Sequence, residues 1–111
     1  MRAFSLILFS AFICCISEAA SAQTADRTIE EIKTETLARA QTGAYPALGI
    51  APGDASDALG RINTRDPDEW AAAWSTIGER YASSAATEES SDKAKAQQDY
   101  LMAWRYYSFA R

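Results

Sequence analysis

Apolar residues recur at helical spacing in four segments of this chain. The first segment opens at Thr28, where the sequence T-I-E-E places Glu31 three residues after a threonine, which is the pattern of a capping box. Apolar residues then follow one stripe, with charged residues outside it, until Gly43 ends the pattern. We therefore predict a first helix between Thr28 and Thr42.

A loop and a short second helix are predicted next. Residues 43–54 are rich in glycine and proline, which favours a loop. Tyr45, Leu48 and Ile50 are nevertheless apolar, and we expect them to anchor this loop to the helices. Asp54 is expected to cap the short helix. Its apolar positions are Ala55, Ala58, Leu59 and Ile62.

The clearest start signal in the chain is the sequence Asp66-Pro67. Asp66 is a favourable N-cap and Pro67 suits the first helical position, so a third helix is predicted from here. Its apolar positions, three or four residues apart, are Trp70, Ala73, Trp74, Ile77 and Tyr81. Residues 83–91 are small and polar, and we interpret them as a connection or a frayed helix end.

A fourth helix is predicted to start near Asp92 and to form an antiparallel hairpin with the third, joined through residues 85–89. Its second half is apolar on all sides, which is typical of a helix that is covered all round. We expect one group of side chains to face the third helix, namely Tyr100, Trp104 and Tyr107. The group expected to point away consists of Met102, Tyr106 and Phe109. Such a helix needs more protein to cover its second face than four short helices provide.

No segment after residue 22 alternates apolar and polar residues with a period of two, so the predicted fold class is all-α, with about four helices. Residues 1–22 have the pattern of a secretory signal peptide: Arg2 precedes an apolar run over residues 3–16, and cleavage is predicted after Ala22. That run is short for a membrane span, so we expect no stable membrane anchor after cleavage. The expected product is one exported domain, residues 23–111, in the periplasm or outside the cell.

Composition removes the usual catalytic groups. The chain has no histidine, and its two cysteines, Cys14 and Cys15, lie in the predicted signal peptide. Residues 23–111 therefore cannot form a serine–histidine–acid triad or a cysteine–histidine pair, because the base is missing. They also cannot form a metal site that uses histidine or thiolate ligands. The net charge of −4 argues against a nucleic-acid partner. We predict no catalytic residue, no cofactor, no metal site and no enzymatic activity for the chain by itself.

Aromatic side chains are the remaining candidates for a function. They could line a pocket or a face for a partner, or they could simply form the core of the helical hairpin, which is the usual role of aromatic residues at helical spacing. The candidate residues are Trp70, Trp74, Tyr81, Tyr100, Trp104, Tyr106, Tyr107 and Phe109.

Three stretches, in order, resemble the N-terminal helical region of α/β-hydrolases, closest to FrsA-like esterases and 2,6-dihydroxypseudooxynicotine hydrolase. These stretches are TIEEIKTETLARAQTGAYPALGI, DPDEWAAAWSTIGERY and YLMAWRYYSFAR. The resemblance implies a helical cap segment that precedes a core hydrolysing ester or C–C bonds and contributes to the pocket over its active site. Ala110 stands where that pattern has glycine, and the catalytic residues of the family would lie beyond Arg111. The resemblance therefore implies a non-catalytic cap fragment whose partner is the missing hydrolase core.

A second hypothesis is a complete, small, secreted helical module, similar to a tetratricopeptide hairpin, that docks a partner protein through exposed aromatic residues. The sequence shows no internal repeat of about 34 residues, which counts against this alternative.

Overall fold

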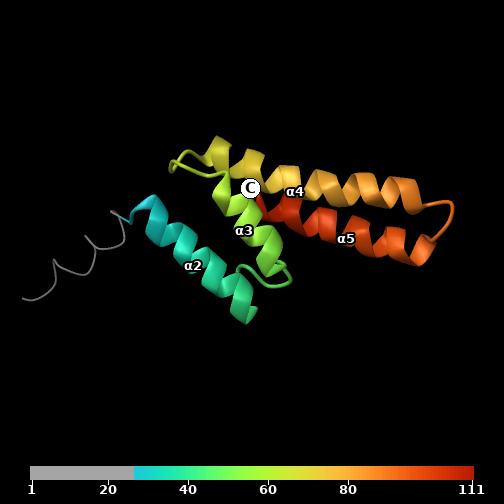
Figure 1. The fold of residues 1–111 in the computed structure, drawn as a ribbon, viewed down its shortest axis with the longest axis horizontal. Helices are drawn as coiled ribbons and strands as arrows, with labels where there is room; N and C mark the ends of the chain where they lie inside the picture. The colour runs from blue at the N-terminus through green and yellow to red at the C-terminus, as the bar shows by residue number, and fades with distance from the viewer. Residues whose placement is uncertain (1–26) are drawn as a thin grey trace, which may run out of the picture.

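The computed structural model describes residues 27–111, which form four α-helices and no β-strand (Figure 1). The predicted all-α class is therefore confirmed. The helices are α2 (Ile29–Thr42), α3 (Pro52–Gly60), α4 (Pro67–Glu88) and α5 (Lys93–Phe109). None of these four helices has the length and apolar character that a membrane span requires. The predicted signal peptide and its cleavage site lie outside the described residues.

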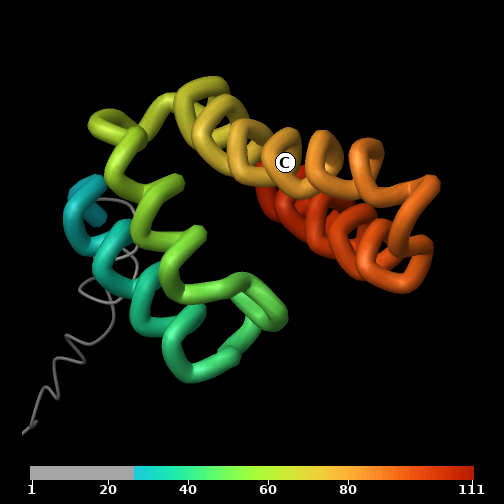
Figure 2. Tube along the Cα trace, turned by 45° about the vertical axis from the view of Figure 1, so that its right-hand side comes forward, coloured from blue at the N-terminus to red at the C-terminus, as the bar shows by residue number. Residues whose placement is uncertain are grey.

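The helices are arranged as two pairs. α4 and α5 run antiparallel along each other, as predicted, and α2 lies beside α3 (Figures 1 and 2). α3 also packs on α4 and so joins the two pairs. No Cα atom of α2 lies within 8 Å of one in α4 or α5. The first helix is therefore held away from the hairpin, and side chains alone approach across the space between them.

Side-chain caps set the start of three helices at the predicted places. The Thr28 hydroxyl accepts a hydrogen bond from the Glu31 backbone at 3.2 Å, and the Glu31 carboxylate accepts one from the Thr28 backbone at 2.9 Å. Asp66 caps α4 and Asp92 caps α5, each through its carboxylate. α2 ends at Gly43, whose φ of 66° is the left-handed conformation that glycine adopts readily.

The loop after α2 differs from the prediction in two respects. α3 begins at Pro52, with Ala51 as its N-cap, so Asp54 lies inside the first turn and does not cap the helix. Ile50 is buried as expected, but Tyr45 and Leu48 are 82% and 70% exposed and anchor nothing. The loop turns twice between residues 44 and 50, and this path buries Ala47 and Ile50 while directing the two larger side chains outward.

The connection between α4 and α5 is shorter than predicted. Residues 83–88 continue α4 to its end at Glu88, and the turn occupies residues 89–92. Ala85 on α4 and Ala96 on α5 are both buried at this end of the hairpin. Their small side chains let the two helices remain packed here, while the serines and threonines of the same segment face solvent or bond to the backbone of the helix. The predicted connection over residues 85–89 was therefore wrong.

Candidate functional site

The aromatic residues predicted as a possible site divide into a buried cluster and an exposed face. Trp74 lies at the centre of the buried cluster and is fully excluded from solvent. Its indole stacks on Tyr106 at a centroid distance of 6.2 Å and meets the edge of Phe109 at 4.6 Å. Trp70 packs one turn earlier at 5.6 Å and donates its indole N–H to the Phe109 carbonyl at 3.2 Å. These rings form the core between α4 and the end of α5.

Two tyrosines in this cluster share one carboxylate. Tyr81 and Tyr106 donate hydrogen bonds to the same oxygen of Asp54, at 2.5 and 2.6 Å. The Tyr106 hydroxyl also accepts from the Ala51 backbone at 3.2 Å, and the two phenol rings stack at 5.5 Å. Asp54 therefore joins α3 to both helices of the hairpin.

Burial, and then the hydrogen bond to Asp54, raise the pKa of Tyr81 to about 12. The same two causes raise the pKa of Tyr106 further above the ordinary tyrosine value. Both phenols therefore stay protonated at neutral pH and act as hydrogen-bond donors. This arrangement joins α3 to the hairpin through two hydrogen bonds.

The predicted orientation of α5 was largely inverted. Tyr106 is fully buried against Trp74, and Phe109 and Met102 pack on the core, although all three were expected to point away. Trp104 and Tyr100 were expected to face α4 but are 64% and 41% exposed. The physical reason is that Tyr106 alone combines a ring that stacks on Trp74 with a hydroxyl that reaches Asp54, and this pair of contacts fixes the rotation of the helix.

Tyr107 lies at the boundary between the two faces. A methyl group built at Gly78 would come within 3.0 Å of the Tyr107 ring, so this ring packs directly on α4, as predicted. Tyr107 as a whole remains 38% exposed. The absence of a side chain at Gly78 is what lets an aromatic ring from α5 lie flat against α4.

The second half of α5 has an outer surface that is largely apolar and uncovered within the described chain. We call it the α5 aromatic face, and it consists of Tyr100, Leu101, Trp104 and Tyr107. Trp104 lies four positions after Tyr100, three after Leu101 and three before Tyr107, so these residues form one stripe along two turns of the helix. The Tyr100 hydroxyl donates to Glu89 at 2.5 Å, which fixes one end of the stripe to the hairpin turn.

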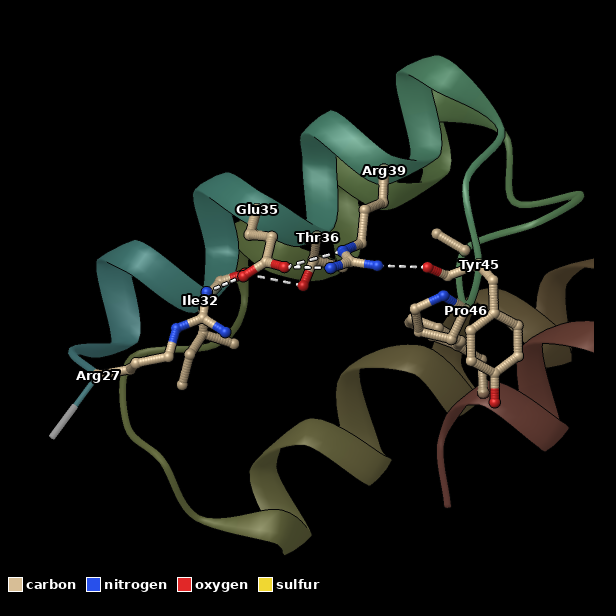
Figure 3. Close-up of a pocket in the computed structure, with 9 residues that line it drawn as sticks. Arg27, Ile32, Glu35, Thr36, Arg39, Tyr45 and Pro46 are labelled. Carbon is tan, nitrogen blue, oxygen red and sulfur yellow. Dashed lines mark hydrogen bonds and ion pairs between the residues drawn. The ribbon is translucent and has the colours of Figure 1, made fainter. Parts of the chain in front are cut away.

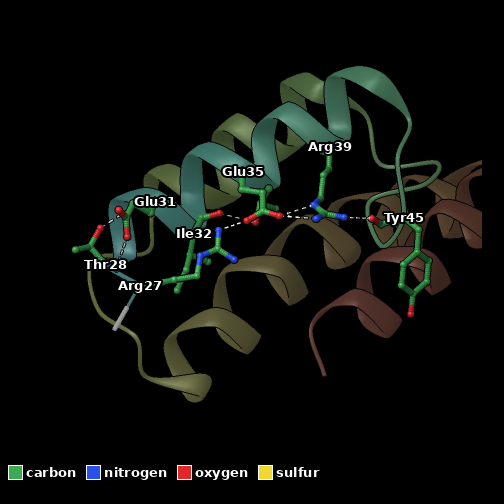
Figure 4. Close-up of polar contacts among 8 residues, drawn as sticks. Arg27, Thr28, Glu31, Ile32, Glu35, Arg39 and Tyr45 are labelled. Atoms are coloured by element: carbon green, nitrogen blue, oxygen red, sulfur yellow. Dashed lines mark hydrogen bonds and ion pairs between the residues drawn. The ribbon is translucent and has the colours of Figure 1, made fainter. Parts of the chain in front are cut away.

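A cavity of about 310 Å³ opens between α2, the following loop and the end of α5 (Figure 3). The Glu35 carboxylate lies on its wall between two guanidinium groups. Arg39 donates to one carboxylate oxygen, with Nε at 2.9 Å, and Arg27 pairs with the other oxygen (Figure 4). Arg39 also donates to the Tyr45 carbonyl at 2.5 Å. Two arginines and one carboxylate leave this cavity with an excess of one positive charge.

Two acidic residues near the start of α4, Asp66 and Glu69, have structural partners. Glu69 accepts hydrogen bonds from Thr64 and Asn63, and these bonds lower the pKa of its carboxylate. Asp66 caps α4, and Asp68 is in its first turn, where the helix dipole favours a negative charge. In residues 27–111, no group of three or more histidine, cysteine, aspartate or glutamate side chains is placed to hold a metal ion.

The cavity between α2, the following loop and the end of α5 was not predicted from the sequence. Its wall combines residues from α2, from the loop and from α5, and no local pattern records that these segments meet. The spacing of Glu35 and Arg39, four residues apart on α2, was the one local signal of the ion pair. Arg105 of α5 lies against Gly49 of the loop, where an added Cβ would be 2.7 Å from the Arg105 Nη1 atom.

Neither a protein-family model, nor a curated protein, nor a solved structure matches this chain significantly. The resemblance to the helical region of α/β-hydrolases therefore stays a prediction that rests on the three stretches quoted above.

Proposed function

We propose that this chain is a non-catalytic helical cap segment that packs against an α/β-hydrolase core through the α5 aromatic face. The observation that carries the proposal is the exposure of Trp104 and Leu101, at 64% and 49%, beside Tyr100 and Tyr107. The N-terminal pattern supports export to the periplasm or the exterior. In the resembled family, the cap precedes a core that hydrolyses ester or C–C bonds.

The energetics of the hairpin support this assignment. Burying a large apolar side chain contributes about 1.5–3 kcal/mol, and α5 already achieves this on its inner side with Tyr106. The outer side presents tryptophan, leucine and tyrosine together in one stripe. Tryptophan and tyrosine are enriched where proteins meet, and contiguous apolar surface commonly marks such a contact. A partner that covers this stripe would complete the burial of α5.

The described residues also support a non-catalytic role. The hydroxyls of Tyr81 and Tyr106 are held protonated by their hydrogen bonds to Asp54. With no histidine in the sequence, a serine has no usual base to activate it.

An assay for ester hydrolysis tests this part of the proposal. The purified chain is expected to turn over a chromogenic short-chain ester no faster than a heat-denatured sample. Reproducible turnover above that control, retained after a further purification step, would contradict a non-catalytic role.

Sequencing the gene through and beyond the codon for Arg111, together with its neighbouring reading frames, tests the proposed partner. We expect a hydrolase core with a G-x-S-x-G motif, followed by an acid and a histidine. Co-expression of that core with this chain should yield a complex, and Trp104→Ser should weaken it at least tenfold. Unrelated sequence throughout the region would contradict the hydrolase assignment.

The closed core of the described helices favours one alternative. Trp74, Tyr106, Ile62 and Ile77 are fully buried by residues 27–111 alone. A chain with such a core suits a self-standing helical module, similar to a tetratricopeptide hairpin, that binds a partner protein through the same α5 aromatic face. A cooperative thermal transition by a defined monomer would favour this module, whereas a broad transition with strong binding of a hydrophobic dye would favour the cap segment.

A further inference from the structure

Arg105 on α5 is a half-buried cation without a carboxylate partner in the described part of the chain. Within residues 27–111, the other half-buried cations each pair with a glutamate on α2, and they are Arg27, Lys33 and Arg39. Arg105 forms no ion pair with any described residue. Its charge is therefore partly removed from water and is not balanced by residues 27–111.

The guanidinium group of Arg105 also has little to donate to. Its one hydrogen-bond partner among the described residues is the Met102 sulfur, 3.8 Å from Nη1, and a thioether is a weak acceptor. A guanidinium group carries five N–H donors, so most of them have no acceptor within residues 27–111. A carboxylate placed against this group would accept charge-assisted hydrogen bonds from two of these donors.

Gly49 leaves room for this side chain in the loop after α2. A Cβ atom at Gly49 would lie 2.7 Å from Nη1 of Arg105, so a larger residue there would displace the guanidinium group. Gly49 also has a φ of 78°, a conformation that glycine adopts readily. The loop backbone therefore positions the guanidinium group beside the second half of α5.

Exposed apolar residues border Arg105 on the helix and on the loop. Leu101 lies one turn earlier on α5 and belongs to the α5 aromatic face. Leu48 directly precedes Gly49 and is also exposed. The apolar surface of α5 therefore continues from Leu101 past Arg105 to the loop.

The segments that form this surface carry no acidic residue. Residues 43–53 and 100–109 contain no aspartate or glutamate. The acids that directly follow or precede these segments have partners, since Asp54 accepts from two tyrosines and Asp99 pairs with Lys95. Arg105 is therefore a local positive charge on a chain whose net charge is −4, and its complement is an acidic group.

We propose that the partner of the α5 aromatic face presents a carboxylate, from an aspartate or glutamate side chain, to Arg105. Apolar side chains of the partner cover Leu101 and Leu48 and exclude water from the ion pair, which strengthens it. Arginine is frequent among the residues that contribute most to protein–protein binding. This inference rests on the proposed docking to a hydrolase core and adds the charge that the docking surface of that core carries.

Fluorescence titration of the purified chain with pyrenebutyrate and with pyrenebutanol tests the role of Arg105. The two probes share an aromatic body, and pyrenebutyrate alone carries a carboxylate. Arg105→Gln should weaken pyrenebutyrate binding about tenfold and leave pyrenebutanol binding unchanged, because only the first probe loses an ion pair. Arg105→Lys keeps the charge and should bind pyrenebutyrate more tightly than Arg105→Gln does. Trp104→Ser should weaken the binding of both probes.

Lys93→Gln is the matched control. Lys93 is exposed, lies on the same helix and forms no ion pair within residues 27–111, so this change removes the same charge far from Leu101. Pyrenebutyrate binding should equal that of the unmodified chain. The proposal is overturned if pyrenebutyrate does not bind, if Arg105→Gln and Lys93→Gln have equal effects, or if Arg105→Gln weakens both probes equally.

The complex with the hydrolase core separates this inference from the proposed docking. Arg105→Glu should weaken the complex at least tenfold, because it places two like charges together, whereas Lys93→Glu should leave its affinity unchanged. An unchanged affinity in Arg105→Glu, together with a loss in Trp104→Ser, would overturn the carboxylate at Arg105 and leave the docking through α5 standing. An unchanged affinity in both variants would overturn the docking and this inference with it.

Discussion

At the scale of single residues, Asp54 explains most of how the helices are joined. Its carboxylate accepts from one phenol on α4 and one on α5, while its backbone belongs to α3. A charged acceptor strengthens each of these hydrogen bonds relative to a neutral one. The sequence suggested a capping role for Asp54, because an acid after proline and glycine is typical of a helix start. Its actual partners are 27 and 52 residues away, and no local pattern records such distances.

Asp54→Asn should destabilise the chain. It keeps the shape of the side chain but removes the charge that both phenols bond to, and we expect a loss of about 2 kcal/mol in the free energy of unfolding. Asp57→Asn is the control: Asp57 pairs with Arg61 and Arg80 at the surface, where a pair contributes about 0–1 kcal/mol. Urea unfolding measures the free energy of unfolding of both variants. An equal loss in Asp54→Asn and Asp57→Asn would show that Asp54 contributes no more than a surface acid does.

The same site predicts a decline in stability at alkaline pH. The pKa of Tyr81 is raised to about 12 and that of Tyr106 is also raised, so the folded state keeps protons that the unfolded state loses near pH 10. The unfolded state binds fewer protons in this range, and the free energy of unfolding should fall as pH rises from about 10 toward 12.

Urea unfolding at pH 9, 10 and 11 tests this decline. The fall should be shallower in Tyr81→Phe and Tyr106→Phe than in Tyr45→Phe, because Tyr45 is 82% exposed. A slope that is identical in all three variants would contradict the account of Asp54.

At the scale of helices, the residues at which three helices begin were predictable from the sequence. The rotation of α5 about its own axis, which decides its buried side, was not. Thr28, Asp66 and Asp92 cap their helices through side chains only a few residues away, so sequence alone located these starts. The buried side of α5 depends on which of several apolar residues meets α4. Tyr106 and Trp104 are both large aromatic residues, and the buried one is selected by contacts with Trp74 and Asp54, which are distant in sequence.

Gly78 provides a test of how α4 and α5 meet. Gly78→Val places a side chain where the Tyr107 ring now lies, and we expect a loss of about 1–3 kcal/mol from overpacking. The same change at Gly60, where an added Cβ has nothing within 4 Å, should alter stability by less than about 0.5 kcal/mol. Thermal unfolding compares the two. Equal unfolding midpoints for the two variants would show that the packing of the Tyr107 ring does not require the absence of a side chain at position 78.

At the scale of the whole molecule, the described chain closes one core and leaves one apolar stripe open. The helical periodicity of the sequence was sufficient for the all-α class and the hairpin. It also suggested that α5 has more apolar surface than the chain can cover. The cavity between α2, the following loop and the end of α5 was not foreseeable, because its wall combines residues that are distant in the sequence.

Replacing Trp74 with alanine should reduce stability, whereas replacing Trp104 with alanine should leave stability nearly unchanged. Trp74→Ala opens a cavity in the core and should cost about 3–5 kcal/mol of stability. Trp104→Ala should change stability by less than about 0.5 kcal/mol but reduce binding of a hydrophobic dye, because its side chain is 64% exposed. Unfolding and dye fluorescence on both variants measure this contrast, and an equally large loss of stability in Trp104→Ala would contradict the exposed face.

The most direct test of the central claim is chemical labelling of Trp104 with and without the hydrolase core. An indole-specific oxidant should modify Trp104 rapidly in the chain alone, while Trp74 is protected by its own core. In the complex with the core, labelling of Trp104 should fall at least tenfold. Gln97→Ser, two turns earlier on the same side of α5, should leave the affinity of the complex unchanged, whereas Trp104→Ser should weaken it at least tenfold. Unchanged labelling of Trp104 in the complex would contradict docking through the α5 aromatic face.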